Sequence, residues 1–294
     1  MIMKKIGIVV DAAVDLPQEM IEKHQIALVP VKMDWPDLEK MTGKNTFEKM
    51  RELEKRGIKS FGKTSQPSPK DFLNVYKKQL ESFEKVLCIT ITSKLSGTYN
   101  SAVQGVKFLP ADQQERIFIV DSLSASPGEG LLVLKAVDLI EQGKEIRDIK
   151  KALEELVPRV SVFVMFENPK YIEASGRISS LIATLLKQAI KLGIRPLLTF
   201  KDGLLVPAGM KVGAKDIPTA LFKTFQKEVK KKKQEGENIK IIITHADDLE
   251  GANRLKRMIE EEFGNAKVIA IHIVDDILGT LTGFDTLILG WCKD

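Results

Sequence analysis

Residues 86–100 read VLCITITSKLSGTYN, and this stretch decides the fold. Its first seven residues are apolar or β-branched and lie between polar residues, as expected of a strand that is buried on both faces. The next residues, SKLSG, form a polar loop before another helix. The stretch therefore predicts a buried strand whose end leads directly into a helix.

The same order of strand, polar loop and helix occurs on both sides of this stretch. Residues 6–10 are apolar and precede a short helix, and residues 117–120 precede a helix over 131–140. Three such units in succession favour a parallel sheet with covering helices, in which the strand-to-helix loops share one edge. A further helix is predicted to begin at Ser68-Pro69, with Ser68 as its cap and Pro69 as its first residue.

A domain boundary is predicted near Pro158, which ends a helix over 146–157 and precedes an apolar strand over 160–166. We therefore expect an N-terminal α/β domain over 1–158 and a C-terminal α/β domain over 159–294. The elements predicted in the second domain are a helix over 178–190, a hairpin with its turn at 201–203, helices from 217 and over 249–263, and strands over 239–244 and 268–274.

The composition is that of an ordinary globular protein. Hydrophobic residues make up 44% and charged residues 29%, which excludes a disordered chain. A net charge of +5 and 6% aromatic residues argue against a dedicated nucleic-acid binder. Asp11 interrupts the only apolar stretch near the N-terminus, and no run approaches the roughly 20 apolar residues of a membrane span. Cys88 and Cys292 are too few for a disulfide framework, so we expect a cytoplasmic protein with reduced thiols.

Ser96, Gly97 and Thr98 lie where a predicted strand ends and a predicted helix begins. Unpaired N–H groups and the helix dipole favour an anion at such a place, and Ser96 can add its hydroxyl while Gly97 leaves room for the ligand. Helix capping alone is the simpler alternative. Thr64 and Ser65 occupy a second loop before a helix, with the same two interpretations. Both loops are expected at the carboxyl edge of the sheet, where open parallel sheets bind ligands.

Further short motifs are spread over nearly the whole chain. In chain order they are the strand ending in Asp11, Thr64-Ser65-Gln66-Pro67, Leu95-Ser96-Gly97-Thr98-Tyr99, Val120-Asp121-Ser122, Gly176-Arg177-Ile178-Ser179, and Arg195-Pro196-Leu197-Leu198 before Asp202-Gly203. Each motif is weak evidence alone, but the ordered set is specific. In this order the motifs resemble the DegV family.

The resemblance implies two α/β domains with a long-chain fatty acid in the cleft between them, its carboxylate held by Thr64 and Ser96. It implies a lipid-binding protein rather than an enzyme, without cofactor, metal, nucleic acid or integral membrane segment. A tail of about 14 methylenes could gain on the order of 11 kcal/mol on burial, so chain length should matter more than either hydroxyl. The remaining ligand-binding residues implied by the motifs are Ser65, Gly97, Thr98 and Arg177.

Some family members present the bound fatty acid to a separate fatty acid kinase, so the resemblance also implies a possible kinase subunit as partner. The sequence departs from the family where residues would face the new phosphate. Gly213 stands near the family's arginine, Leu281 stands near its histidine, and Ala12 replaces its usual serine. Kinase coupling is therefore left open by the sequence.

Two other function classes also stay open. In the first, the anion site binds a small phosphorylated or carboxylated metabolite, and Asp11 and Asp121 are the candidate acid and base of an enzyme. In the second, the protein is an interaction module, which an exposed apolar patch would favour. A metabolite enzyme would not need an apolar tunnel. The candidate tunnel residues, which are core residues in the simpler interpretation, are Phe163, Phe166, Leu181 and Leu186.

Two groups of histidine and aspartate follow predicted strands and have side chains that could bind a metal. The resemblance implies no metal, and hydrogen bonds to loop backbone are the simpler interpretation. The two groups are His245 with Asp247 and Asp248, and His272 with Asp275 and Asp276.

Overall fold

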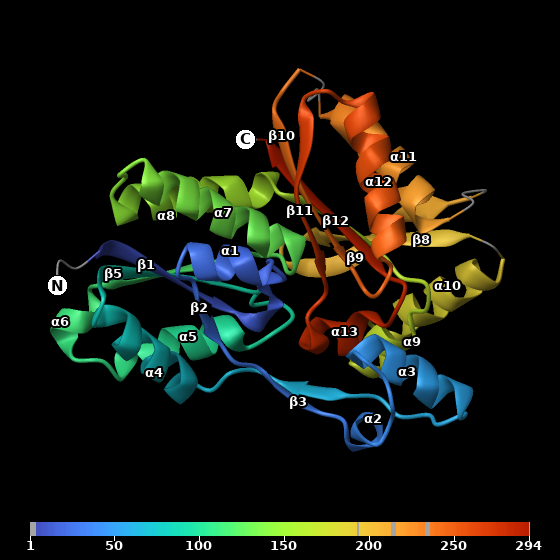
Figure 1. Ribbon diagram of the computed structural model, residues 1–294, viewed down its shortest axis with the longest axis horizontal. Helices are drawn as coiled ribbons and strands as arrows, with labels where there is room; N and C mark the ends of the chain where they lie inside the picture. The colour runs from blue at the N-terminus through green and yellow to red at the C-terminus, as the bar shows by residue number, and fades with distance from the viewer. Residues whose placement is uncertain (1–3, 193, 213–215, 233–235, 294) are drawn as a thin grey trace. The chain divides into compact units, whose positions relative to one another are not determined.

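The structure is a computed structural model that shows a mixed α/β protein (Figure 1). Within the part of the chain that it describes, no helix has both the length and the apolar character needed to cross a bilayer. The described residues are 4–192, 194–212, 216–232 and 236–293.

The chain divides into two compact units and passes between them several times. The predicted boundary at 158/159 lies beside one of these crossings, at 160/161. A single cut assigns residues 33–64 to the first domain, whereas in the structure this segment packs with the second unit. The first unit holds the described residues up to Lys32, Ser65–Val160 and Asp202–Leu204. The second holds Met33–Thr64, Ser161–Lys201 and the described residues from Leu205 onward.

The first unit is built on a parallel sheet in the order β2-β1-β5-β6, as the repeated strand and helix pattern predicts. Helices α7 and α8 cover one face and α4 and α5 the other (Figure 1), so the middle of β5 is completely buried. The unit's elements are β1 (Lys4–Asp11), α1 (Gln18–Lys23), β2 (Ala27–Val29), α4 (Pro69–Leu80), β5 (Phe83–Thr90), α5 (Thr98–Lys107), α6 (Ala111–Gln114), β6 (Ile117–Asp121), α7 (Pro127–Glu141), α8 (Ile146–Leu156) and the 3₁₀ turns Ala12–Val14 and Val157–Arg159.

The predicted cap of α4 is confirmed. The Ser68 hydroxyl accepts a hydrogen bond from the Asp71 N–H at 3.3 Å, and the Asp71 carboxylate accepts one from the Ser68 N–H at 2.8 Å. This reciprocal pair satisfies two donors that helix geometry leaves without an intrahelical partner. Pro69 follows as the first helical residue, where its missing N–H costs nothing.

The second unit has a mixed sheet in the order β11-β10-β12-β7-β8-β9. Strand β12 runs antiparallel to both β10 and β7, and the sequence analysis did not predict it. Its Trp291 is 0% exposed and packs at 5.2 Å from Phe225 and 5.4 Å from Phe163, measured between ring centroids, so β12 lies in the core. The elements outside residues 33–64 are β7 (Ser161–Met165), α9 (Lys170–Ala174), α10 (Ser180–Lys191), β8 (Arg195–Lys201), β9 (Leu204–Lys211), α11 (Ile217–Lys231), β10 (Ile239–His245), α12 (Leu249–Glu262), β11 (Ala266–Ile273), α13 (Asp276–Thr282) and β12 (Leu287–Lys293).

Residues 33–64 form a small subassembly of the second unit. It contains a two-stranded sheet. Phe47 packs so tightly against Gly279 of α13 that a Cβ added to Gly279 would lie 2.9 Å from the Phe47 ring. This packing explains why the segment belongs to the second unit although both flanking segments belong to the first. Its elements are β3 (Lys32–Asp34), α2 (Pro36–Glu39), α3 (Thr46–Lys55) and β4 (Lys63–Ser65).

Candidate functional site

The Ser96 loop lies in the first unit between β5 and α5, as predicted. The cap position of α5 is Gly97, and Ser96 stands one residue before it. The Ser96 hydroxyl accepts a hydrogen bond from the Thr98 N–H at 3.3 Å and lies 2.8 Å from the Thr98 hydroxyl. If Thr98 donates between the two hydroxyls, the hydrogen of Ser96 is available to an acceptor outside the loop. The Ser96 hydroxyl thus accepts from the first helical N–H and can also donate to an anion.

Gln66 is a residue of this site that the sequence analysis did not single out. Its side chain lies on Gly97, where a Cβ would come within 2.0 Å of the Gln66 Oε1 atom, and its Nε2 donates to the Ser101 hydroxyl at 3.1 Å. Gly97 is therefore required for close approach of Gln66. The signal was present in the sequence, because Gln66 belongs to the Thr64-Ser65-Gln66-Pro67 motif.

Thr64 lies in the strand β4, which pairs with β3, and not in a loop. That part of the prediction is wrong, because the subassembly of residues 33–64 has a sheet of its own. Ser65 ends the same strand and is exposed. Thr64 is half-buried, and its hydroxyl accepts a hydrogen bond from Arg177 Nη2 at 3.1 Å within the second unit. Two predicted site residues 113 positions apart are thus in contact.

The Arg177 guanidinium is half-buried. The backbone N–H of Arg177 donates to the Ser175 hydroxyl at 3.3 Å, and its side chain donates to the Thr64 hydroxyl. Among the described residues, no carboxylate forms an ion pair with it, and burial alone lowers its pKa. A buried cation without a counter-charge is unfavourable, so this position favours an anion.

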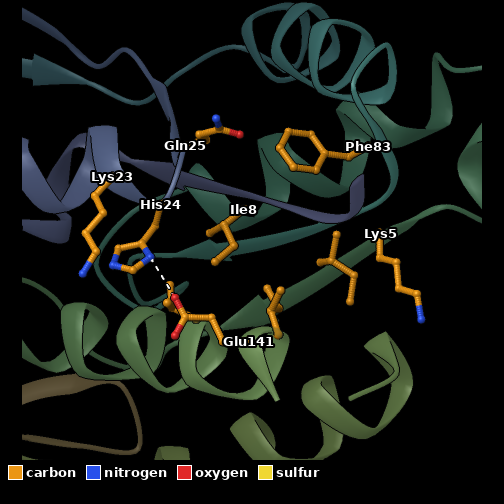
Figure 2. A pocket seen from close by; sticks show the side chains of 10 residues that line it. Lys5, Ile8, Lys23, His24, Gln25, Phe83 and Glu141 are labelled. Atoms are coloured by element: carbon orange, nitrogen blue, oxygen red, sulfur yellow. Dashed lines mark ion pairs between the residues drawn. The ribbon is translucent and has the colours of Figure 1, made fainter. Parts of the chain in front are cut away.

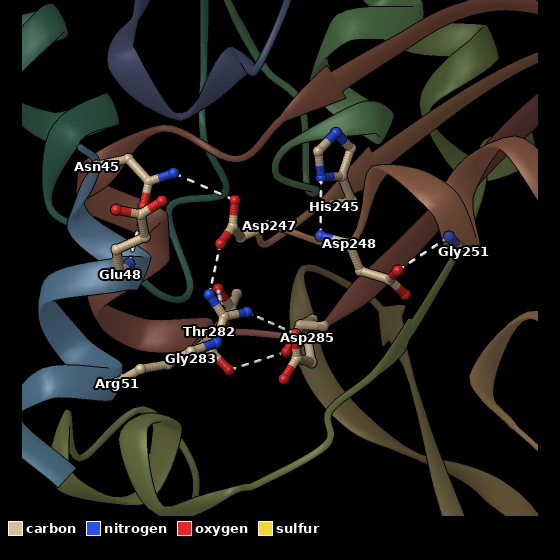
Figure 3. A network of polar contacts seen from close by, with 11 residues as sticks. Asn45, Glu48, Arg51, His245, Asp247, Asp248, Gly251, Thr282, Gly283 and Asp285 are labelled. Carbon is tan, nitrogen blue, oxygen red and sulfur yellow. Dashed lines mark hydrogen bonds and ion pairs between the residues drawn. The ribbon is translucent and has the colours of Figure 1, made fainter. Parts of the chain in front are cut away.

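Arg51 of α3 joins the subassembly to the rest of the second unit (Figure 3). Its two terminal nitrogens bind Asp247 at 2.5 Å and Asp285 at 2.7 Å, and its guanidinium lies 4.8 Å from the centroid of the Phe284 ring. Burial opposes the charge, but the hydrogen bonds to the two aspartates outweigh it and raise the pKa of Arg51. Asn45 also donates to Asp247, at 3.2 Å. Charge pairing therefore adds to the Phe47 packing that holds α3 in the second unit.

Four of the six side chains considered as metal ligands have hydrogen-bond or ion-pair partners, namely those of His245, Asp247, Asp248 and Asp275. His245 Nδ1 accepts from the Asp248 N–H at 3.2 Å, and burial lowers the pKa of both His245 and His272. Asp248 and Asp275 accept from the first turns of α12 and α13, at 2.9 and 2.8 Å. In the described part of the chain, no group of three or more histidine, cysteine, aspartate or glutamate residues is placed to hold a metal ion.

The turn after α13 packs on Tyr171. Gly283 has a φ of +74°, and a Cβ there would lie 2.4 Å from the Tyr171 ring, so both conformation and space require glycine. Burial, and then the hydrogen bond to Glu54, raises the pKa of Tyr171. Leu281, near the family's histidine position, is buried at 6% exposed. Gly213, near the family's arginine position, lies outside the described residues.

Asp11 and Asp121, the candidate acid and base of an enzyme, hold loop backbone at the ends of β1 and β6. Asp11 is 0% exposed and accepts from the N–H groups of Ala13 and Ile91, at 2.9 and 2.8 Å. Asp121 accepts from Ser93 and from a second loop amide, both at 3.1 Å. These contacts give each carboxylate a structural role.

Figure 2 shows a cavity of about 390 Å³ in the first unit. It lies at the amino ends of the parallel strands β1 and β5, whereas the Ser96 loop follows the carboxyl end of β5. It is lined by the starts of β1 and β5, including Ile6 and Phe83, and by the carboxyl ends of α1 and α7. His24 and Glu141 both line it, with 3.5 Å between Nδ1 and Oε1. The cavity is therefore not part of the predicted anion site.

The candidate tunnel residues differ in exposure. Three of them are buried, with exposed fractions of 8% for Phe163 and 4% for both Phe166 and Leu186. Leu181, on α10, is 70% exposed, so it is neither a core residue nor part of the wall of a closed tunnel.

A family model described as "Uncharacterised protein, DegV family" matches residues 5–294. The chain belongs to the DegV family. A fatty acid-binding protein of Thermotoga maritima is 30% identical over 286 residues, which cover 94% of this chain and 91% of that protein. A DegV domain-containing protein of Clostridium acetobutylicum is 35% identical over 207 residues, covering 68% of this chain and 70% of the relative.

Solved structures of DegV proteins have the same fold. A DegV family protein from Thermus thermophilus, described as binding fatty acid, superposes with a TM-score of 0.82 at 27% identity, over 99% of this chain and all of that one. A stearic acid-binding protein from Eubacterium ventriosum gives 0.83 at 23% identity, covering 99% of this chain and 98% of its own. The predicted fold class, two α/β units with a parallel sheet in the first, is confirmed.

Proposed function

We propose that this chain binds a long-chain fatty acid whose carboxylate contacts Thr64, Ser96 and Arg177. The observation that carries the proposal is the half-buried Arg177 guanidinium, which donates to the Thr64 hydroxyl and has no acidic partner among the described residues. The ligand class is supported by the relative from Thermotoga maritima, a fatty acid-binding protein similar to this chain over almost its whole length.

The chemistry of Arg177 and Thr64 suits a carboxylate. A guanidinium offers several N–H donors in a plane, and hydrogen bonds between ionised groups are about twice as strong as neutral ones. The bound carboxylate would supply the charge that Arg177 lacks. Thr64 accepts from Arg177, so its own hydroxyl hydrogen is free to point at the ligand.

Chain connectivity supports a shared ligand for Thr64 and Ser96. Gln66 lies on Gly97, next to Ser96, and Thr64 precedes Gln66 by two residues. Two extended residues span at most about 7 Å, so the backbone limits how far Thr64 can lie from Gln66. Ser65, Gly97 and Thr98 complete the proposed headgroup site.

The apolar tail supplies most of the affinity, and the headgroup residues select for the acid. At about 0.8 kcal/mol per buried methylene, the tail outweighs hydrogen bonds that contribute about 1.5–3 kcal/mol to a charged group. Removing Arg177 should therefore weaken binding of an acid by roughly ten- to a hundredfold and leave binding of the matching alcohol unchanged.

The test compares palmitate with the alcohol of the same length on delipidated protein. Arg177→Gln should lose its preference for the acid, while Arg257→Gln, which removes an exposed arginine of α12, should bind both like the parent. Equal loss of both ligands in Arg177→Gln would mean that the arginine supports only the fold, and an unchanged acid preference would place the headgroup elsewhere.

A second measurement identifies the ligand that copurifies with the protein. Denaturing extraction and mass spectrometry should find a long-chain fatty acid in the parent and less of it in a Thr64→Ala, Ser96→Ala double variant. A short phosphorylated or carboxylated metabolite instead would favour the enzyme alternative.

We infer that the protein acts by binding rather than catalysis and without a cofactor, because the two candidate acids, Asp11 and Asp121, already accept from loop amides. A fatty acid kinase as partner and a cytoplasmic location stay predictions.

A further inference from the structure

A second cavity, of about 340 Å³, opens at the carboxyl end of α3 within the second unit. We call it the α3 pocket and define it by Leu53, Ile58, Phe61 and Tyr171. Leu53 and Tyr171 are buried at 2% and 4% exposed, whereas Ile58 and Phe61 are 38% and 39% exposed. Two large apolar side chains that face water around one concavity mark an interaction surface.

The α3 pocket is preformed. The rings of Phe61 and Tyr171 meet edge to face with centroids 5.7 Å apart, and the Tyr171 hydroxyl donates to Glu54 at 2.5 Å. Lys170 pairs with the same carboxylate, so the acid at the pocket is already neutralised. A partner would not have to order these walls, which lowers the entropic cost of binding.

The segment that supplies Ile58 and Phe61 to the α3 pocket is basic, and its Lys59 lines the pocket. Residues 55–63, KRGIKSFGK, contain four cations and no acid. Arg56 pairs with Glu52 on its own helix. In the described part of the chain, no ion pair joins the other three cations, all exposed, to an acid. These cations are Lys55, Lys59 and Lys63.

We propose that the α3 pocket receives an apolar side chain from an acidic segment of a partner protein. The pocket fits the apolar side chain and the surrounding lysines attract its acidic neighbours, which is the arrangement of a buried anchor with a charged rim. An anionic bilayer would be attracted to the same lysines. It is the poorer fit, because the apolar surface is concave and a bilayer projects no side chain into it.

The occupied surface would adjoin the proposed headgroup site. Lys63 and Thr64 are consecutive residues of β4, so a segment bound to the lysines would lie beside the residue proposed to hold the carboxylate. The docking proposal itself does not depend on which ligand that site binds.

The test uses a fluorescent peptide of alternating glutamate and aspartate around one central leucine, titrated with the full-length protein. The parent should bind it saturably. Ile58→Asn should weaken binding by about tenfold, and Lys59→Glu should weaken it by a similar factor that shrinks as salt is added. The matched controls are Phe108→Ser and Lys107→Glu, exposed positions of the first unit, which should bind like the parent.

Two further arms separate the possible results. A peptide with alanine in place of the central leucine should bind at least several-fold more weakly; equal binding would show charge attraction alone and overturn the proposal. Absence of saturable binding, or equal loss in the controls, would also overturn it.

Vesicles of phosphatidylcholine and phosphatidylglycerol should bind no better than the peptide, and binding to vesicles alone would assign the surface to a membrane. Unchanged thermal unfolding of Ile58→Asn shows that the variant is folded.

Discussion

Glu129→Gln should stabilise the first unit at neutral pH. Glu129 lies in the first turn of α7 and is 0% exposed, and neither of its carboxyl oxygens has a hydrogen-bond partner among the described residues. Burial, followed by the nearby charges of Asp11, Asp15 and Asp121, raises its pKa well above the ordinary value. The folded protein therefore holds a neutral acid here, and glutamine has nearly the same shape without the ionisable proton.

The magnitude follows from proton linkage. In the unfolded chain the carboxyl loses its proton above its ordinary pKa of 4.5, whereas the folded protein keeps it. The folded state then binds more protons, so stability falls as the pH rises, by about 1.4 kcal/mol per pH unit until the folded-state pKa is reached. Between about pH 5 and the raised folded-state pKa of Glu129, the parent should therefore lose stability that Glu129→Gln does not lose. Below about pH 4 this difference should vanish, because both states are protonated.

The two cysteines allow the stability of each unit to be measured separately. Cys88 is buried in the core of the first unit and Cys292 in β12 of the second. Thiol labelling at increasing urea, followed by mass spectrometry of each cysteine peptide, reports the opening of each unit. Comparing variant with parent at the same pH cancels the pH dependence of the labelling reaction itself. Glu84→Gln, at an exposed strand position, is the matched control.

The expected result is a pH-dependent gain in protection of Cys88 in Glu129→Gln, with Cys292 unchanged. A constant difference between parent and variant from pH 5 to 8 would refute the reasoning, because it would mean that Glu129 is ionised in the folded protein. A variant less stable than the parent at every pH would show that the glutamine amide cannot be accommodated.

Two further predictions concern the site and its support. Arg51→Lys should destabilise the second unit by about 1–3 kcal/mol, because a single ammonium cannot pair with Asp247 and Asp285 through two separate nitrogens. The second unit's cysteine should then be labelled at lower urea than in the parent, and unchanged labelling would contradict this. Gly97→Ala should displace the flexible Gln66 side chain and weaken palmitate binding by roughly tenfold without lowering the thermal unfolding temperature, whereas unchanged affinity would show that Gln66 has no part in binding.

The sequence by itself determined many of the local elements of both units. The β-branched run of β5, the Ser68 cap of α4 and the Asp202-Gly203 turn act on neighbouring residues, so their signals are readable in short stretches. The turn has positive φ at both positions, +50° and +81°, as a tight hairpin requires. The order of the DegV motifs also predicted the segments that are proposed to bind the ligand.

Tertiary structure alone decided how distant segments combine. Residues 33–64 join the second unit partly through Arg51, whose acidic partners lie 196 and 234 positions away, and Thr64 contacts Arg177 across 113 positions. Strand β12 enters the sheet between β10 and β7, which flank it in space but not in sequence. Ion pairs and strand pairing over such separations depend on which surfaces fold against one another, and a single sequence carries no periodic pattern that specifies the partner.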